Sequence, residues 1–197
     1  MRFEGDALIP APQEAVWAGL NDPDVLRRAI PGCQSMERTG EREFTATVVA
    51  RVGPVSATFR GKVELADLDP PNGYTLKGRG QGGPAGFAKG EAHVRLTSEN
   101  GGTRLTYEAE ADIGGKIASV GGRLIQGVAK KTADDFFAAF GRVLTGAADA
   151  PVDAVEGAAP TAGVTTGPAA GHIPLIDRVA WLLVGLALGV GLTLWLG

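Results

Sequence analysis

One glycine-rich stretch of the sequence has the spacing of a nucleotide-binding motif. The residues GRGQGG, Gly78–Gly83, satisfy the pattern GxGxxG, which binds a dinucleotide when it joins a strand to a helix whose N-terminus faces the pyrophosphate. Here Pro84 and a run of alternating polar and apolar residues follow, so no helix is expected at that place. The stretch therefore predicts a hairpin or a bulge rather than a nucleotide site.

The other residues with reactive side chains are too few and too scattered for a metal centre or a catalytic dyad. Cys33 follows a Pro-Gly turn without a nearby histidine, so we expect a small buried hydrophobe rather than a nucleophile. His93 falls on the polar phase of its segment, and His172 lies far from it in the sequence. Asp134 and Asp135 are adjacent, whereas residues on one helix face are three or four apart. We therefore expect no catalytic residue and no metal site.

Length and charge exclude further classes of function. The 197 residues leave room for one folded body of ordinary size. Residues 1–145 contain 18 basic and 18 acidic side chains, and such a balance lacks the positive field that gathers nucleic acid. We therefore expect no nucleic-acid partner. The first residues show no basic region followed by an apolar run, so we expect a body that is not secreted.

The segment RVAWLLVGLALGVGLTLWLG, Arg178–Gly197, has the composition of a membrane-spanning helix. Its 18 residues from Val179 to Leu196 carry no charge and span about 27 Å at ~1.5 Å per residue, enough to cross a bilayer core. The flanking charges lie on its N-terminal side, which favours a body on the cytoplasmic side of the membrane. We predict a single-pass C-terminal membrane anchor over residues 175–197.

Four residues of this tail have specific expected roles in the membrane. Trp181 and Trp195 lie near its two ends, where indole rings prefer the level of the headgroups. Gly185 and Gly189 have the GxxxG spacing that lets two membrane helices approach closely, so the tail is also a candidate for self-association.

A stretch of Ala, Gly, Pro and Thr over residues 146–174 separates the tail from the body. It has too little large apolar surface to offset the entropy of ordering, and as a coil it spans roughly 30 Å. We therefore predict three parts: a ligand-binding domain over residues 1–145, a disordered linker over 146–174 and the anchor over 175–197.

The body shows helical spacing at both ends and a period of two between them. Residues 12–33 predict two short helices, because Asn21-Asp22-Pro23 supplies a stop and a new N-cap. Residues 34–113 alternate in polarity, with turns expected at residues 53–54, 69–73 and 100–102. Residues 116–144 return to helical spacing. The fold class is therefore α+β, with one long helix against one antiparallel sheet.

The inward face of the predicted sheet is short of large side chains. Of 24 inward positions, eleven are Ala or Gly, although an ordinary helix-on-sheet core fills a layer about 10 Å thick. Either the sheet curves strongly without a cavity, or an apolar chamber of the size that holds a lipid lies between helix and sheet. The residues expected to line such a chamber are Leu26, Ile30, Phe44, Val48, Phe59, Val63, Leu76, Ala92, Val94, Leu96, Leu105, Tyr107, Ile117, Val120, Leu124, Gly127, Val128 and Phe136.

Three separated motifs carry a resemblance to a known family: VWAGLNDPDVLRRAIPGC at Val16–Cys33, GPAGFAKG at Gly83–Gly90 and GGRLIQGVAKKTADDFF at Gly121–Phe137. Together they resemble the CoxG subunit of carbon monoxide dehydrogenase, a branch of the START-like or Bet v 1-like superfamily, from residue 1 to about residue 144. The resemblance implies a helix-grip fold, in which a curved sheet wraps a long C-terminal helix around an apolar cavity. It also implies association with molybdenum-containing carbon monoxide dehydrogenase or a similar hydroxylase, membrane recruitment and binding of a respiratory quinone.

Three functional hypotheses follow from these features. The favoured one is a non-enzymatic, membrane-anchored carrier that takes a quinone, menaquinone or ubiquinone, from the membrane and serves a molybdenum hydroxylase such as carbon monoxide dehydrogenase. The second is an adaptor that only recruits or assembles that enzyme. The third, a cyclase-like enzyme, needs polar groups in the chamber, and only Tyr74 and Tyr107 bring hydroxyls to the inward face.

The basic side chains of the predicted helices leave their role open. They are Arg27, Arg28, Arg123, Lys130 and Lys131, and they are able to contact anionic headgroups, a partner protein or only solvent.

Overall fold

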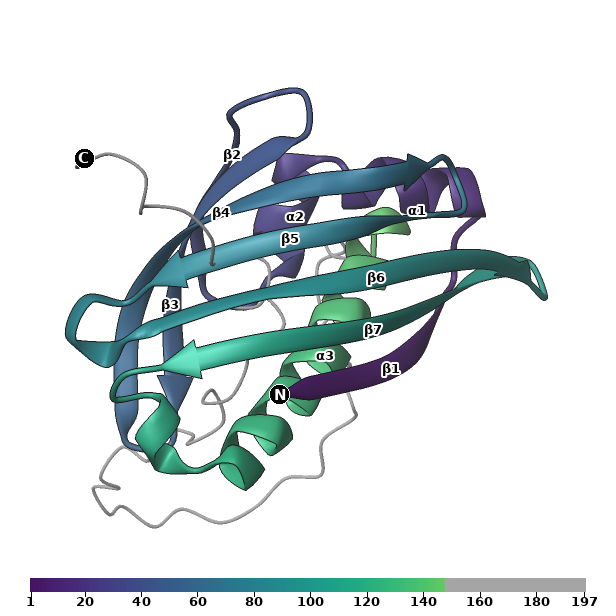
Figure 1. Cartoon of the computed structure of the whole chain (residues 1–197). Helices are drawn as coiled ribbons and strands as arrows, with labels where there is room; N and C mark the ends of the chain where they lie inside the picture. The colour runs from purple at the N-terminus through teal and green to yellow at the C-terminus, as the bar shows by residue number, and fades with distance from the viewer. Residues whose placement is uncertain (148–197) are drawn as a thin grey trace, which may run out of the picture.

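In the computed structural model, which describes residues 1–147, an antiparallel sheet wraps around one long helix (Figure 1). The strands are β1 (Arg2–Ile9), β2 (Cys33–Arg38), β3 (Glu43–Val52), β4 (Val55–Asp69), β5 (Gly73–Gln81), β6 (Phe87–Glu99) and β7 (Gly102–Gly114). The helices are α1 (Gln13–Leu20), α2 (Pro23–Ala29) and α3 (Gly122–Leu144), with short 3₁₀ helices η1 (Gly83–Ala85) and η2 (Ala118–Val120). The α+β class predicted from the sequence is confirmed.

The predicted anchor and nearly all of the predicted linker lie outside the described residues. Within residues 1–147, none of the helices has the length and apolar character required to span a bilayer.

The seven strands follow the order β1-β7-β6-β5-β4-β3-β2, and every neighbouring pair is antiparallel. The three predicted turns all fall between consecutive strands, and the GxGxxG stretch joins β5 to β6 as a hairpin connection. Strand β1 was not predicted. It pairs with β7, with Gly5 opposite Tyr107, and therefore forms one edge of the sheet beside a strand about a hundred residues away in the sequence.

Two short helices precede the meander, as expected, and α2 begins with the predicted cap. The carboxylate of Asp22 accepts the backbone N–H of Asp24 at 2.8 Å, and Pro23 occupies the first helical turn. An oxygen at this position satisfies one of the helix's unpaired N–H groups, which is why Asp is favoured there. Helix α2 then packs against α3.

The long helix starts later than predicted. Gly121, with φ at +95°, separates η2 from α3. Helix α3 therefore begins at Gly122 rather than at Lys116. A positive φ is easily adopted only by glycine, so this residue separates two helical pieces. The buried residues of α3 are Ile125, Val128, Ala129, Thr132, Ala133, Phe140 and Gly141. Among the strands described, its main neighbours are β1 and β3, near the two edges of the sheet.

Candidate functional site

The structure places sixteen of the eighteen predicted lining residues in buried or half-buried positions. The buried ones are Ile30, Phe44, Val48, Phe59, Val63, Leu96, Leu105, Ile117 and Val128. The half-buried ones are Leu26, Leu76, Ala92, Val94, Tyr107, Val120 and Phe136. The remaining two, Leu124 and Gly127, are exposed.

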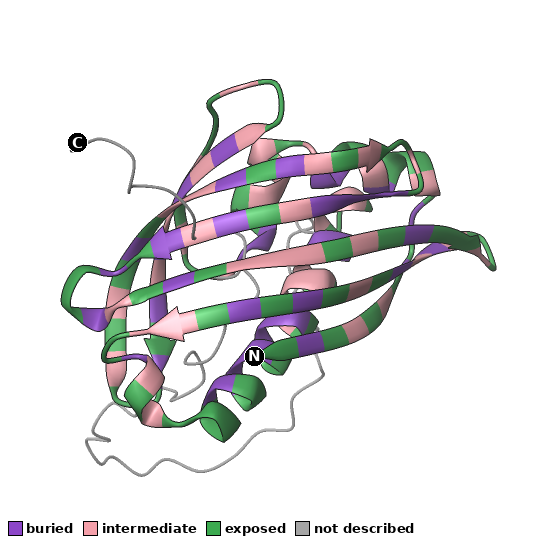
Figure 2. Cartoon of the chain, viewed as in Figure 1, coloured by how far each residue is buried: buried purple, intermediate pink, exposed green. Residues whose placement is uncertain are grey.

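The half-buried residues in the central strands are the informative group. Leu76 and Ala92 are paired neighbours on β5 and β6, and Val94 follows on the same inner face. Side chains in the middle of a sheet covered by a helix are normally fully buried, because interiors are closely packed. Figure 2 shows the intermediate exposure along the middle of β6. Helix α3 has its main strand contacts at β1 and β3, not at β5 or β6, within the described residues.

The prediction that Leu124 and Gly127 face inward is wrong. Leu124 is 43% exposed, and a Cβ atom at Gly127 would meet no atom within 4 Å. The same spacing placed Val128 and Phe136 correctly and failed only in the first turns of α3, just after the break at Gly121. The inward position is taken by Ile125, which is 0% exposed.

Tyr74 is a buried inner-face residue that the lining prediction left out. It is 7% exposed, and its ring lies edge-on to that of Trp17 in α1 with centroids 5.7 Å apart. None of the hydrogen bonds found among residues 1–147 involves its hydroxyl, and because no fully buried side-chain oxygen there lacks a partner, this oxygen keeps some access to solvent. Burial raises the pKa of Tyr74 well above its ordinary value, so the group stays a phenol and keeps a proton to donate.

Tyr107 occupies a different place, at the β1 edge of the inner face. Its hydroxyl lies 2.5 Å from where a Cβ atom of Gly5 would be, and its ring centroid is 5.9 Å from that of Phe137. Burial, followed by the charges of Asp134 and Asp6, raises the pKa of Tyr107. The two inward tyrosines therefore do not form one polar pair.

Three connections meet at one end of the body, near the start of α3 (Figure 1). We call it the loop end and define it as residues 51–56, 79–90 and 112–127. The backbone N–H of Ile117 donates to Ala85 O at 2.8 Å, which ties the β7–α3 connection to η1. A Cβ atom at Gly53 would lie 2.9 Å from Leu124 Cδ2, so the β3–β4 turn approaches the first turn of α3 closely.

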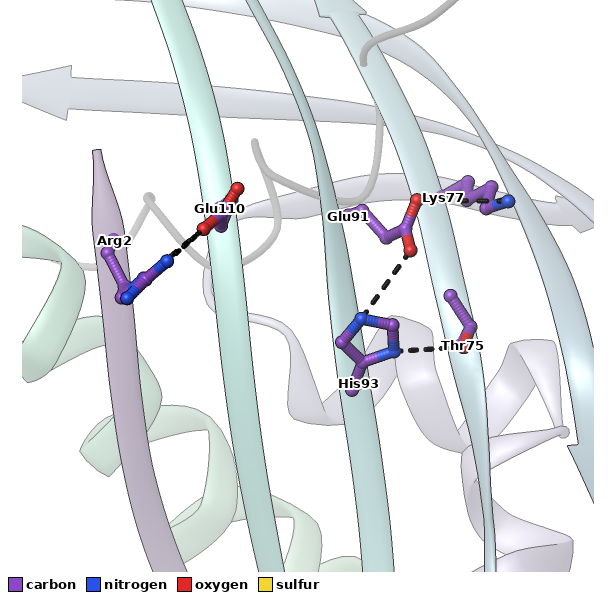
Figure 3. Close-up of polar contacts among 6 residues, drawn as sticks. All are labelled: Arg2, Thr75, Lys77, Glu91, His93 and Glu110. Carbon is purple, nitrogen blue, oxygen red and sulfur yellow. Dashed lines mark hydrogen bonds and ion pairs between the residues drawn. The ribbon is translucent and has the colours of Figure 1, made fainter.

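The outer face of the sheet carries paired charges (Figure 3). It bears a hollow of about 840 Å³ lined by Arg2, Lys77, Glu91 and Glu110, among others. Within it, Arg2 pairs with Glu110 at 2.6 Å and Lys77 with Glu91 at 3.7 Å. Exposed pairs of this kind contribute little free energy. Arg79, which lines the same hollow, has no carboxylate partner among residues 1–147.

His93 lies on this outer face, as its polar phase predicted, between Thr75 and Glu91 (Figure 3). Its Nδ1 is 3.0 Å from Thr75 Oγ1 and its Nε2 is 3.5 Å from Glu91 Oε1. The order of hydroxyl, imidazole and carboxylate is that of a catalytic triad, but such a triad also needs hydrogen-bond donors for an oxyanion. Here the strand N–H groups are engaged with neighbouring strands. Within residues 1–147, no group of three metal-ligating side chains gathers at one place.

Cys33 is half-buried, and its thiol donates a hydrogen bond to Ser35 O at 3.3 Å. Burial is the largest effect on it and raises the pKa of the thiol. The thiolate is the reactive form, so a raised pKa makes this cysteine a poor nucleophile at neutral pH.

Comparison with known proteins agrees with this architecture. The family model for the CoxG subunit of carbon monoxide dehydrogenase matches residues 5–145. A conserved protein from Geobacillus kaustophilus is 34% identical, with a TM-score of 0.70 over 75% of this chain and 97% of its own. Comparison with curated proteins gives no match.

Two further solved structures share the fold at lower identity. TTHA0849 from Thermus thermophilus is 18% identical with a TM-score of 0.57, over 76% of this chain and 100% of its own. Protein Ms6760 from Mycobacterium smegmatis is 19% identical with a TM-score of 0.57, over 74% of this chain and 92% of its own.

Proposed function

The chain belongs to the CoxG family of carbon monoxide dehydrogenase subunits, and on this basis we propose that it is a membrane-anchored carrier of a respiratory quinone. Family and fold together favour ligand binding over catalysis. The observation that carries the proposal is the half-buried row of Leu76, Ala92 and Val94 in the centre of a sheet that α3 covers. Water-accessible apolar side chains in that position are what an unfilled chamber produces.

The proposed chamber suits an apolar molecule of moderate size. The residues around it are aliphatic and aromatic, and many inner positions carry Ala or Gly in place of larger side chains. Sites for small ligands are typically apolar, with a few polar groups that fix orientation. A quinone has this character, since it combines a hydrocarbon chain with a ring that carries two carbonyl oxygens.

Tyr74 is the residue we assign to orienting the quinone. Its phenol is protonated and makes no hydrogen bond within the described part of the chain, so it is able to donate to a carbonyl oxygen. In the proposed complex a ligand carbonyl takes the place of solvent at this hydroxyl.

The anchor and the family name supply the rest of the proposal. An apolar ligand of this kind dissolves only in the bilayer, and a tether of roughly 30 Å keeps the body close to that phase. We propose that residues 175–197 hold the chain on the cytoplasmic face of the inner membrane. There it takes menaquinone or ubiquinone and serves a molybdenum-containing carbon monoxide dehydrogenase or a related oxidoreductase.

Tryptophan fluorescence tests the role of Tyr74. The sequence has three tryptophans, so the full chain with Trp181→Phe and Trp195→Phe retains Trp17 alone, beside Tyr74. A short-chain quinone is expected to quench Trp17 saturably. In this background Tyr74→Phe should raise the Kd about fivefold, because one net hydrogen bond is worth ~1 kcal/mol.

Thr106→Val is the control, since it removes a hydroxyl from the exposed outer face of β7. It should leave the Kd within error of the parent. Quenching that does not saturate, or equal Kd values for Tyr74→Phe and Thr106→Val, would contradict the proposed site.

A further inference from the structure

The loop end is the positively charged part of a body whose overall charge is balanced. Within its three segments lie five basic residues and one acidic residue: Arg51, Arg79, Lys89, Lys116, Arg123 and Asp112. The three segments are far apart in the sequence, and their connections lie at one end of the fold (Figure 1). Arg79, Lys89 and Asp112 also line the hollow on the outer face of the sheet.

Most of this positive charge is unpaired. Lys89 pairs with Asp112 at 3.0 Å, whereas Arg51, Arg79, Lys116 and Arg123 have no carboxylate partner among residues 1–147. Elsewhere on the sheet some basic side chains are matched across neighbouring strands, as Lys62 is with Glu43 at 2.6 Å, while Arg60 and Arg95 have no carboxylate partner among the described residues. The loop end differs in balance, because its segments carry five basic residues against one acidic residue.

The same end displays exposed apolar side chains. Only four large hydrophobic residues are exposed in the described part of the chain, and two of them, Leu124 at 43% and Phe87 at 37%, lie here. Pro54 and Pro84, in the adjoining turns, are exposed as well. Apolar groups beside unpaired cations are the composition of surfaces that rest on lipid.

Helix stability does not account for the charge at the start of α3. Arg123 lies in the first turn, where the helix dipole favours acidic side chains, and this turn has no acidic residue and no side-chain cap. A basic residue there is unfavourable for the isolated helix. An external anionic surface would offset that disadvantage.

We propose that the loop end docks on an anionic lipid surface, with Leu124 and Phe87 at the headgroup level and the four unpaired cations near lipid phosphates. Basic segments close to a membrane are attracted by anionic lipids within a Debye length. This docking rests on the proposed function in one respect: the proposed anchor brings the body to the bilayer. It orients the body so that the connections around the N-terminal end of α3 face the lipid, the source of the proposed ligand.

Hydrogen exchange on the full chain tests this docking. The chain is inserted in nanodiscs of phosphatidylcholine, with or without phosphatidylglycerol, and no quinone is added. In the anionic discs, exchange in residues 51–56, 83–87 and 115–124 is expected to slow severalfold. The turns at 69–73 and 100–102, at the opposite end, should exchange equally in both discs.

Two double variants with the same change in net charge provide the matched comparison. Arg51→Glu with Arg123→Glu should abolish the protection at the loop end. Arg42→Glu with Arg95→Glu, away from the loop end, should retain it.

Equal exchange in both kinds of disc, or equal loss of protection in the two variants, would overturn the docking. Protection that appears only when carbon monoxide dehydrogenase is added, whatever the lipid charge, would make the loop end a protein contact and overturn it too. Quinone binding is measured separately, by the quenching of Trp17 fluorescence. A failure of the carrier function therefore appears in that quenching, and a failure of the docking appears in the hydrogen exchange.

Discussion

Replacing Ala92 with phenylalanine is expected to weaken quinone binding by about tenfold or more while the body stays folded. Ala92 is half-buried on the inner face of β6 and pairs across strands with Leu76 and Ala109. A ring added here occupies the space assigned to the ligand. Overpacking a filled core costs about 1–3 kcal/mol, whereas a ring that enters open space costs much less.

The measurement combines Trp17 quenching with thermal unfolding, and Ala15→Phe serves as the control. Ala15 is exposed on α1, so the same added volume there should change neither quantity. If Ala92→Phe strongly lowers the Tm, the space is already filled by the protein. If the variant folds and still binds quinone with the parent's Kd, the chamber is not the binding site and a pure adaptor becomes the better explanation.

Deleting residues 175–197 is expected to move the chain from the membrane fraction to the soluble fraction. These residues contain the run of 18 uncharged positions, and no helix within residues 1–147 is able to substitute for it. Weak binding that remains through the loop end should be removed by salt, because exposed charges are screened over about 8–10 Å at physiological ionic strength.

Fractionation of cells followed by immunodetection measures this effect. Replacing the segment with an unrelated membrane helix of equal length should restore the membrane location, which separates anchoring from association through Gly185 and Gly189. A truncated chain that stays in the membrane fraction at high salt would rule out the anchor.

The parts of the fold that the sequence predicted correctly are those with local causes. Pro and Gly near residue 54, and Asn and Gly near residues 73 and 101, mark turns because few other residues adopt such backbone conformations. The cap at Asp22 is equally local. Strand β1 escaped prediction because its partner is β7, about a hundred residues away.

The candidate site was only partly predictable for a related reason. Alternation identified the inner face of the sheet, but the inward residues in the first turns of α3 depended on the break at Gly121. The contact of the Tyr74 ring with Trp17 depends on where α1 lies against β5, which no spacing within the meander reveals. The charge of the loop end is likewise invisible in the sequence, since its cations come from three separated segments.

A quinone held between α3 and the sheet is what the proposed function requires above all. Native mass spectrometry of the full chain, purified gently from its own membranes, detects such a ligand, and organic extraction identifies it. We predict one quinone per chain, and none with Ala92→Phe prepared in the same way. A chain that brings no lipid through purification, and takes up none when menaquinone or ubiquinone is added, would show that the proposed carrier function is wrong.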